Sequence, residues 1–420
     1  EMIRWNVRTP EEVTGDIRSQ VAANHVCGQK IIEMMADEGL DSLEGLADEI
    51  IQRTEQSMRQ AIAMIPDGVY PYEGVIEGAG ERDDINIRLT VAVKDSDIRV
   101  DFSNTSLQVN WGVNVVYNFT YAYVFMAIKS VFDPDLPINA GAIRPVTMTA
   151  PEGSVVNCSF PAAVAARMQV GHFMTEMVFR ALSTAVPDRI ISDSGGTPAQ
   201  TNIFYGKRHD GKPFHTMIIR GGGLGASRSK DGHQCAIFPA NGANTPIEIL
   251  ESDTPLMVLA RELICDSGGA GNKRGGLGRR MCIRVPNDAF APEAPVSIAV
   301  QAGRFRYPPN GIFGGKHGNK ARFLKNDLAG DPSGLTFCSP GDTIEFQSAG
   351  GGGFGSPLER DISDVERDVN YGYVSIEKAQ NDYGVVIDET ALKADGNATR
   401  RLRASMRKSR TLPEVSGGEK

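Results

Sequence analysis

The segment Asp266-Ser-Gly-Gly-Ala-Gly-Asn-Lys-Arg-Gly-Gly-Leu-Gly-Arg-Arg280 combines glycine with basic side chains more densely than the rest of the chain. Glycine lets several backbone N–H groups turn toward one point, and lysine or arginine adds charged donors, so the combination suits a phosphate or a carboxylate. It is no Walker loop, because no Gly-Lys-Ser/Thr sequence closes it. Tight turns in a β-rich domain, with solvated arginines, explain the same composition, and both interpretations stay open at this point.

Two other glycine-rich runs lie on either side of this segment. Residues 221–226, Gly-Gly-Gly-Leu-Gly-Ala, follow the apolar residues 217–219 and satisfy a loose G-x-G-x-x-A pattern. No amphipathic helix follows them, so the βαβ context of a dinucleotide site is missing. A structural turn, or the backbone wall of a small-molecule pocket beside Asp231 and His233, fits better. Residues 350–355 predict a close approach of two chain segments.

Hydrophobic periodicity predicts helices and a small sheet near the start of the chain. Apolar residues recur at helical spacing over residues 10–65, with a break at Glu38-Gly39, which predicts two antiparallel helices. Alternating runs between Gly- and Asp-rich turns predict a β-meander, with strands at residues 68–76, 85–93 and 98–102.

The remainder of the chain changes from helical to β-type and back. Residues 110–132 and 162–186 have helical spacing, whereas short β-type runs separated by Gly and Pro fill residues 197–350. Residues 361–410 are expected to be helical, with Asp388 as a helix cap. The pattern therefore predicts a multi-domain α+β fold, with an N-terminal helical hairpin and β-meander and a β-rich C-terminal half closed by helices.

Domain boundaries are expected near residues 110 and 255. Residues 1–110 would hold the hairpin and meander, 111–255 a mixed α/β region, and 256–410 a β-rich domain with Gly-rich loops and C-terminal helices. Residues 411–420 are expected to form a disordered tail.

Composition excludes several classes of protein. The net charge of −8 gives no general attraction to nucleic acid, and no apolar stretch is long enough for a membrane span. Six scattered cysteines without a CxxC pair indicate a reducing compartment, so we expect a cytoplasmic protein. The chain begins Glu-Met-Ile-Arg-Trp, with neither an initiator Met nor a signal peptide, which suggests a truncated or processed start.

Local catalytic motifs are absent from the sequence. No histidine pair has HxH or HExxH spacing, and no GxSxG elbow occurs. His172 lies at the start of a helical run, where a satisfied or surface imidazole is the commoner finding. Cys265 ends the apolar run Leu263-Ile264 and is expected to be buried.

Many sequence blocks occur together in one order. They are Arg8-Thr-Pro-Glu-Glu-Val-Thr-Gly-Asp16, Pro66-Asp-Gly-Val-Tyr70, Val100-Asp-Phe-Ser-Asn-Thr-Ser106, Asp135-Leu-Pro-Ile-Asn-Ala-Gly141, Pro151-Glu-Gly-Ser154, Pro161-Ala-Ala-Val164, residues 221–232, Asn244-Thr-Pro246, residues 266–278, Tyr307-Pro-Pro309 and residues 350–355. With this set, the chain resembles the hydantoinase B/oxoprolinase family, which also includes acetone carboxylase α-type subunits and related lactamases. The resemblance covers residues 8 to about 408. It departs from the commoner pattern at residues 167–172, on which substrate identity is expected to depend.

The resemblance implies a two-component, ATP-dependent enzyme. A hydantoinase A-type partner with an actin-like ATPase fold would bind ATP and phosphorylate the substrate, and this subunit would complete hydrolysis of a lactam or hydantoin in a hetero-oligomer. Two alternatives remain: a subunit of an acetone-type ketone carboxylase, and a structural scaffold that clamps the ATPase subunit. Family members carry a further N-terminal segment whose His and Asp motifs are usually taken as the metal site. A divalent metal is expected there, so no metal ligand is assigned to this sequence.

Site residues follow from the resemblance and the glycine-rich runs. The candidate catalytic residues are Asp266, Arg274, Asp231 and His172. The candidate substrate- and anion-binding residues are Gly222, Gly223, Gly268, Gly269, Gly271, Gly275, Gly276 and Arg167.

Overall fold

The structure is a computed structural model that describes residues 1–7, 9–78, 80, 82–198 and 200–411. It confirms the α+β class and divides into two compact units. The first unit is Glu1–Arg59 with Leu136–Pro145, and the second is Gln60–Asp135 with Val146–Lys420. Most of the predicted tail, residues 412–420, lies outside the described residues. In the part of the chain that is described, no helix combines the length and hydropathy needed to cross a membrane.

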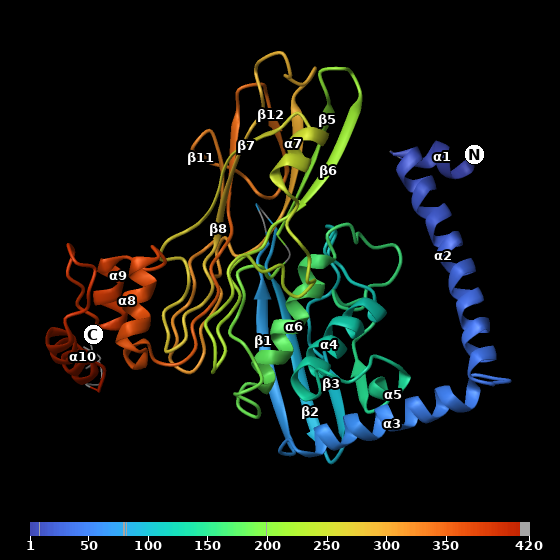
Figure 1. The fold of residues 1–420 in the computed structure, drawn as a ribbon, viewed down its shortest axis with the longest axis horizontal. Helices are drawn as coiled ribbons and strands as arrows, with labels where there is room; N and C mark the ends of the chain where they lie inside the picture. The colour runs from blue at the N-terminus through green and yellow to red at the C-terminus, as the bar shows by residue number, and fades with distance from the viewer. Residues whose placement is uncertain (8, 79, 81, 199, 412–420) are drawn as a thin grey trace. The chain divides into compact units, whose positions relative to one another are not determined.

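The first unit contains two of the expected helices, but they do not form a hairpin. Helix α1 spans Met2–Asn6, α2 Pro10–Asp37 and α5 Ala140–Ile143, and α3 (Glu44–Ala63) belongs to this unit as far as Arg59. A turn at Gly39, with φ +64°, separates α2 from α3 at the predicted break, yet the two helices leave this turn in different directions (Figure 1).

The partner of α3 in this unit is a segment distant in sequence, which explains why the hairpin prediction is wrong. Asn139 Nδ2 donates to Thr54 Oγ1 at 2.9 Å. A Cβ on Gly141 would lie 2.0 Å from the carbonyl oxygen of Ile51, so this glycine lets the 139–141 turn contact the α3 backbone. Periodicity alone could not identify this partner, because it finds an apolar face without saying what covers it.

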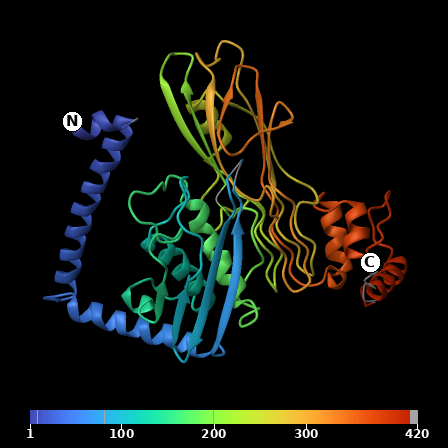
Figure 2. The same cartoon turned by 180° about the vertical axis from the view of Figure 1, so that it is seen from behind.

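The predicted meander is confirmed in the second unit. Strands β1 (Gly68–Ile76), β2 (Ile85–Lys94) and β3 (Asp97–Asp101) are antiparallel neighbours, and β4 (Val146–Thr149) pairs in parallel with β3. Burial alternates along β2, so one face of this sheet is covered. Helices α4 (Tyr117–Phe132) and α6 (Met168–Leu182) lie beside the sheet (Figures 1 and 2).

A glycine in β1 lets helix α6 approach the sheet closely. A Cβ on Gly74 would lie 2.4 Å from Met177 Sδ and 2.9 Å from a ring carbon of Phe173. Both side chains project from α6, so the helix rests directly on the β1 backbone. This contact positions the cleft described below.

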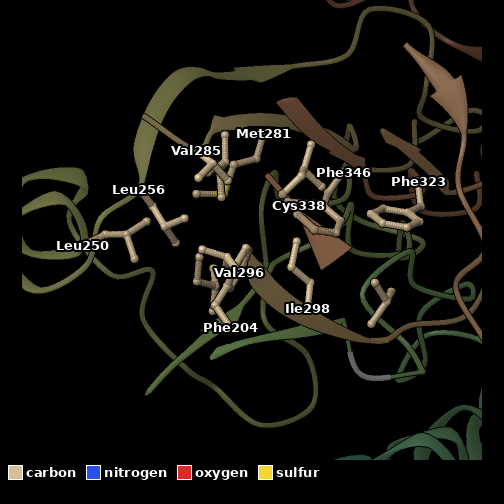
Figure 3. Close-up of a cluster of buried hydrophobic side chains, with 14 of the residues drawn as sticks. Phe204, Leu250, Leu256, Met281, Val285, Val296, Ile298, Phe323, Cys338 and Phe346 are labelled. Carbon is tan, nitrogen blue, oxygen red and sulfur yellow. The ribbon is translucent and has the colours of Figure 1, made fainter. Parts of the chain in front are cut away.

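Two further sheets enclose an apolar core. One has the order β11-β10-β13-β8-β7 and the other β12-β9-β5-β6. Their strands are β5 Thr201–Lys207, β6 Pro213–Ile219, β7 Met257–Leu263, β8 Arg279–Arg284, β9 Val296–Gln301, β10 Arg322–Lys325, β11 Leu328–Ala329, β12 Leu335–Cys338 and β13 Thr343–Gln347, with α7 Ile247–Asp253 between β6 and β7. Buried side chains from both sheets, including Phe204, Met281 and Phe346, pack together (Figure 3).

Strand pairing crosses both expected domain boundaries. β4 pairs with β3 although residue 110 lies between them, and β9 pairs with β5 although residue 255 lies between them. The predicted boundaries also differ from the division into two compact units. Non-local pairing of this kind leaves no local signal in the sequence.

The three glycine-rich runs form one structural element, which we call the glycine bundle: residues 221–225, 268–278 and 350–355. These segments run side by side beneath the sheets (Figures 1 and 2). They are joined by backbone hydrogen bonds: Gly276 N–H donates to Leu224 at 2.8 Å, Gly351 to Gly276 at 2.9 Å and Gly269 to Gly351 at 2.8 Å. The predicted close approach at residues 350–355 is therefore confirmed.

Glycine is required in the bundle because the segments approach closely. Among its glycines, only Gly355 has a positive φ. A Cβ on Gly223 would lie 1.9 Å from the carbonyl oxygen of Gly276, and one on Gly276 would lie 2.1 Å from that of His233. No side chain fits between backbones at these separations.

We expect Gly276→Ala to lower the free energy of unfolding by about 1–3 kcal/mol, because the new methyl group forces two backbone segments apart. Urea unfolding followed by circular dichroism measures the change. Gly15→Ala is the matched control, since Gly15 lies in the exposed part of α2 with nothing within 4 Å of its Cβ position. Alanine there should be neutral or stabilising by up to about 1 kcal/mol. Equal stability of Gly276→Ala and the wild type would contradict the packing role.

The C-terminal segment is helical, as expected, and carries its own small core. Helices α8 (Ile362–Asn370), α9 (Ile376–Tyr383) and α10 (Gly396–Thr411) follow a 3₁₀ turn, η1 (Pro357–Glu359). The predicted cap, Asp388, is wrong: its carboxylate accepts from Thr390 N and Ala391 N in a turn outside any helix. Asp395 accepts from the first N–H groups of α10 instead.

Candidate functional site

Most of the glycines predicted to bind an anion already use their backbone donors. Five of them donate N–H to backbone carbonyls, in the pairs Gly222 to Ala236, Gly223 to Ala349, Gly269 to Gly351, Gly275 to Gly269 and Gly276 to Leu224. Cβ positions at Gly268 and Gly271 are filled by backbone oxygens at 2.2 and 2.5 Å. The packing of backbone segments therefore accounts for these glycines without an anion, and their predicted role in anion binding stays a prediction.

Two of the predicted catalytic residues, Arg274 and Asp231, belong to a buried ion-pair network. Arg274 is 3% exposed, and its Nε donates to Asp368 Oδ2 at 3.1 Å. Asp231 accepts from both Nη atoms of Arg360, at 2.6 and 2.7 Å. Arg360 also donates to Asp368 at 2.7 Å. The network joins the glycine bundle to α8, so it explains these residues as structural.

The surroundings of Asp231 in this network favour its ionised form. Burial raises the pKa of Asp231, but hydrogen bonds and the charge of Arg360 outweigh it, so the pKa lies below its usual range. The ring of Tyr373 lies 5.3 Å from the Arg274 guanidinium carbon. Every charged group of the network is thus paired within the network.

Asp266 organises the loop before α9. It has φ +62°, and its Oδ1 accepts from Ser375 N at 2.8 Å. Its own N–H donates to Tyr373 O at 3.0 Å. The adjacent Cys265 is exposed, contrary to the expected burial, because β7 ends at Leu263 and Cys265 lies in the turn that follows.

His172 and Arg167 lie on helix α6 and its N-terminal edge, apart from the ion-pair network. The His172 side chain is 2% exposed, and its ring packs 5.2 Å from that of Tyr123. Among the residues that the structure describes, neither ring nitrogen has a hydrogen-bond partner. Arg167 is exposed, with its guanidinium 5.4 Å from the Phe119 ring. The structure therefore does not bring the four predicted catalytic residues into one site.

Burial lowers the pKa of His172 from 6.5 to about 4. In the unfolded chain His172 takes up a proton near pH 6.5, whereas in the folded chain it stays neutral down to about pH 4. The contribution of His172 to the free energy of unfolding is therefore fully present above pH 6.5 and is lost as the pH falls from 6.5 to about 4. Complete loss would amount to about 3 kcal/mol. We expect His172→Leu to remove this part of the acid dependence in urea unfolding at pH 7 and pH 4.5. The prediction is contradicted if the free energy of unfolding falls by the same amount between pH 7 and pH 4.5 in His172→Leu as in the wild type.

A second group of buried polar residues surrounds a small cavity, which we call the Glu176 cleft. The cavity has a volume of about 190 Å³ and lies between β1, α6 and the segments after α6 and β9. Its polar lining includes Tyr72, Glu176, Arg180, Asp193 and Arg304. Both faces of the cleft come from the second compact unit.

Glu176 is the central group of this cleft. It is 3% exposed; its Oε1 accepts from Ser194 N at 2.6 Å, and its Oε2 accepts from Arg304 Nη2. Burial raises the pKa of Glu176 to about 8, with a further contribution from Asp193 and against the opposing charge of Arg304. A carboxyl group that titrates near neutral pH suits proton transfer.

Two arginines and a second carboxylate complete the polar lining. Arg304 is 5% exposed and has φ +73°, a strained conformation for a residue with a side chain. Asp193 Oδ1 is buried, has no hydrogen-bond partner within the described part of the chain, and lies 3.8 Å from Arg180 Nε. Burial also raises the pKa of Tyr72, whose ring lies 5.6 Å from the Arg180 guanidinium carbon.

This arrangement can bind a small polar molecule and move a proton. Arg180 and Arg304 offer forked N–H donors to oxygen atoms, and the Glu176 carboxyl can accept a proton from water. Ligand pockets for drug-sized molecules occupy roughly 300–1,000 Å³, so this cleft suits a smaller one. Among the described residues, no group of three or more His, Cys, Asp or Glu side chains is placed to hold a metal ion.

The sequence interpretation missed Glu176, although one signal was available. Glu176 is a single carboxylate within the largely apolar run Met168–Leu182, where nearly every neighbour is buried. A charged residue at such a position is almost never buried without a partner or a function. Arg304 and Asp193 gave no comparable signal, because their proximity depends on contacts between distant segments.

Comparisons with known proteins agree on one family. A family model described as hydantoinase B/oxoprolinase matches residues 1–357. A protein of Pseudomonas sp. (strain NS671), provisionally named as the B-type component of a D-/L-hydantoinase, is 31% identical over 423 residues, covering 96% of this chain and 70% of that protein. The acetophenone carboxylase delta subunit of Aromatoleum aromaticum (strain DSM 19018 / LMG 30748 / EbN1) is 24% identical, covering 98% of this chain and 66% of that protein. The crystal structure of the ATP-dependent caprolactamase from Pseudomonas jessenii has a TM-score of 0.84 at 26% identity, covering 95% of this chain and 70% of that one.

Proposed function

Because the chain belongs to the hydantoinase B/oxoprolinase family, we propose that it is a subunit of an ATP-dependent cyclic-amide hydrolase and that its Glu176 cleft completes ring opening. One observation carries the assignment to this cleft. A buried carboxyl group with a pKa of about 8 lines a small cavity beside two arginines. The names of its relatives, a hydantoinase component and an ATP-dependent caprolactamase, support the substrate class.

The need for ATP follows from the chemistry of the substrate. An amide carbonyl is a poor electrophile, and transfer of a phosphoryl group to its oxygen makes the carbon open to attack. Water then adds to that carbon, the ring C–N bond breaks as nitrogen receives a proton, and the resulting acyl phosphate is hydrolysed to a carboxylate and phosphate. We assign ATP binding and phosphorylation to a hydantoinase A-type partner with an actin-like ATPase fold, in a hetero-oligomer.

Within this scheme the cleft residues have distinct roles. Glu176 takes a proton from the attacking water and can return it to the leaving nitrogen. Arg180 and Arg304 hold the oxygen atoms on which negative charge develops. Asp193, whose Oδ1 accepts no hydrogen bond from the described residues, orients water or a ring N–H. The described residues do not themselves form a site for the divalent metal that the family resemblance implies, so no step is assigned to a metal.

The test uses the complex of this chain with its ATPase partner. Hydantoin, 5-oxoproline and caprolactam are each incubated with and without ATP, and ring-opened product is measured by mass spectrometry. ATP-dependent product from at least one cyclic amide is expected. In parallel, acetone and labelled bicarbonate are supplied with ATP. Label in a stable C–C product, without ring opening, would replace the proposal with carboxylation, and full activity of the partner alone would reduce this chain to a scaffold.

A further inference from the structure

Two buried arginines lie at the base of the β-sheets without a carboxylate partner. Arg220 directly follows β6 and is 3% exposed, and Arg279 begins β8 and is 4% exposed. Among the described residues, neither forms an ion pair with a carboxylate. The other arginines of comparable burial, Arg274, Arg304 and Arg360, all do.

The partners that these two guanidinium groups do have are neutral. Arg220 Nη2 lies 3.4 Å from Gln200 Oε1, the side-chain oxygen of Asn202 accepts from Arg220 Nε at 2.7 Å, and the guanidinium carbon lies 4.7 Å from the Phe346 ring. Arg279 Nη1 donates to the side-chain oxygen of Asn244. Amide oxygens of this kind accept hydrogen bonds from the guanidinium groups, but they do not neutralise the positive charge of the two arginines.

The pKa values of both arginines also indicate positive charge that is not balanced by a nearby negative group. Burial lowers the pKa of Arg220 to about 9, and the nearby charge of Arg279 lowers it further in the same direction. Burial lowers the pKa of Arg279 to about 10; the Cys235 thiol opposes this shift, and the charge of Arg261 adds to it. Two buried like charges, with a third arginine close by, are costly unless something negative is present.

We propose that Arg220 and Arg279, with Arg261 beside them, form a binding site for a small oxyanion, a phosphate or a carboxylate. The guanidinium fork matches the paired oxygen atoms of either group. Asn244 supplies a neutral contact from the 235–246 loop, which also carries Cys235 next to Arg279. This site shares no residue with the Glu176 cleft, so it stands independently of the proposed hydrolysis.

Binding is measured on the full chain by isothermal titration in a low-chloride buffer, with inorganic phosphate, sulfate and acetate as separate probes. We expect at least one of them to bind the wild type. Arg220→Gln and Arg279→Gln should each weaken that binding by at least about tenfold, because each removes charged hydrogen bonds. Arg280→Gln is the matched control: its side chain follows Arg279 directly but is paired with Glu262 and Glu345, so the affinity should be unchanged. The preferred probe distinguishes a phosphate site from a carboxylate site.

A second measurement needs no variant. Alkylation of Cys235 by iodoacetamide, followed by peptide mass spectrometry, should slow when the binding anion is added, while that of the exposed Cys27 should not. The proposal fails if none of the three anions binds at 20-fold the concentration of protein sites or protects Cys235. It also fails if Arg220→Gln and Arg279→Gln, shown by circular dichroism to be folded, bind as tightly as Arg280→Gln.

Discussion

Arg360→Met is expected to lower the free energy of unfolding by about 3–5 kcal/mol, because it removes the buried guanidinium that pairs with both Asp231 and Asp368 and leaves Asp368 with Arg274 alone. The Arg360 side chain is fully buried, and it bridges Asp231 in the loop beside the glycine bundle and Asp368 on α8. Methionine has a similar shape, so the packing volume is largely kept while the charge is lost. Urea unfolding at pH 7, followed by circular dichroism, measures the change.

Arg367→Met is the matched control for this prediction. Arg367 lies on α8 near the same carboxylates, at 3.9 Å from Asp231, but its side chain is 48% exposed. Exposed ion pairs contribute up to about 1 kcal/mol, so this variant should unfold nearly as the wild type does. Equal losses in the two variants would show that the buried network does not hold α8 to the bundle.

Glu176→Gln is expected to reduce turnover of a cyclic amide by the complex about 10²–10⁴-fold, the range typical for loss of a general acid–base group. Glutamine keeps the size of the side chain, but it cannot accept a proton, and its single carbonyl oxygen can accept from only one of the two donors, Arg304 and Ser194 N. In the wild type the rate should rise with pH toward about 8, as Glu176 loses its proton. That rise should be absent from the residual activity of the variant.

Glu73→Gln controls for changes at the mouth of the cleft. Glu73 also lines the cavity, but it is half exposed and pairs with Arg88 on the surface. Its replacement should leave turnover within a small factor of the wild type. If Glu73→Gln lost as much activity as Glu176→Gln, turnover would depend on the total negative charge around the cleft. It would then not depend specifically on proton transfer by the Glu176 carboxyl group.

Much of the fold could be predicted from local patterns. Strands β1 to β3 alternate in hydrophobicity, and the break before α3 contains a glycine in a left-handed turn, so both were found. The hairpin and the domain boundaries could not be found in this way. They depend on the Gly141 contact with α3 and on the pairing of β4 with β3, which join residues far apart in sequence.

The candidate site was harder to predict, because the glycine-rich segments carry an ambiguous signal. Glycine at residues 268–278 fits both a backbone that faces a ligand and a backbone that faces another backbone. The sequence does not show that Gly276 lies against His233 and Leu224. Arg274 was singled out by its neighbours in sequence, whereas Arg304 acquires its role from Glu176, which lies on a different segment.

The most direct test of the proposed function compares ATP consumption with product formation in the Glu176→Gln complex. If the partner activates the substrate and the cleft completes the reaction, ATP hydrolysis or a phosphorylated intermediate should persist in the variant while ring-opened product falls at least about 100-fold. Wild-type, Glu176→Gln and Glu73→Gln complexes are assayed together for phosphate release and for product by mass spectrometry. Undiminished product formation by Glu176→Gln would contradict the assignment of ring opening to this cleft.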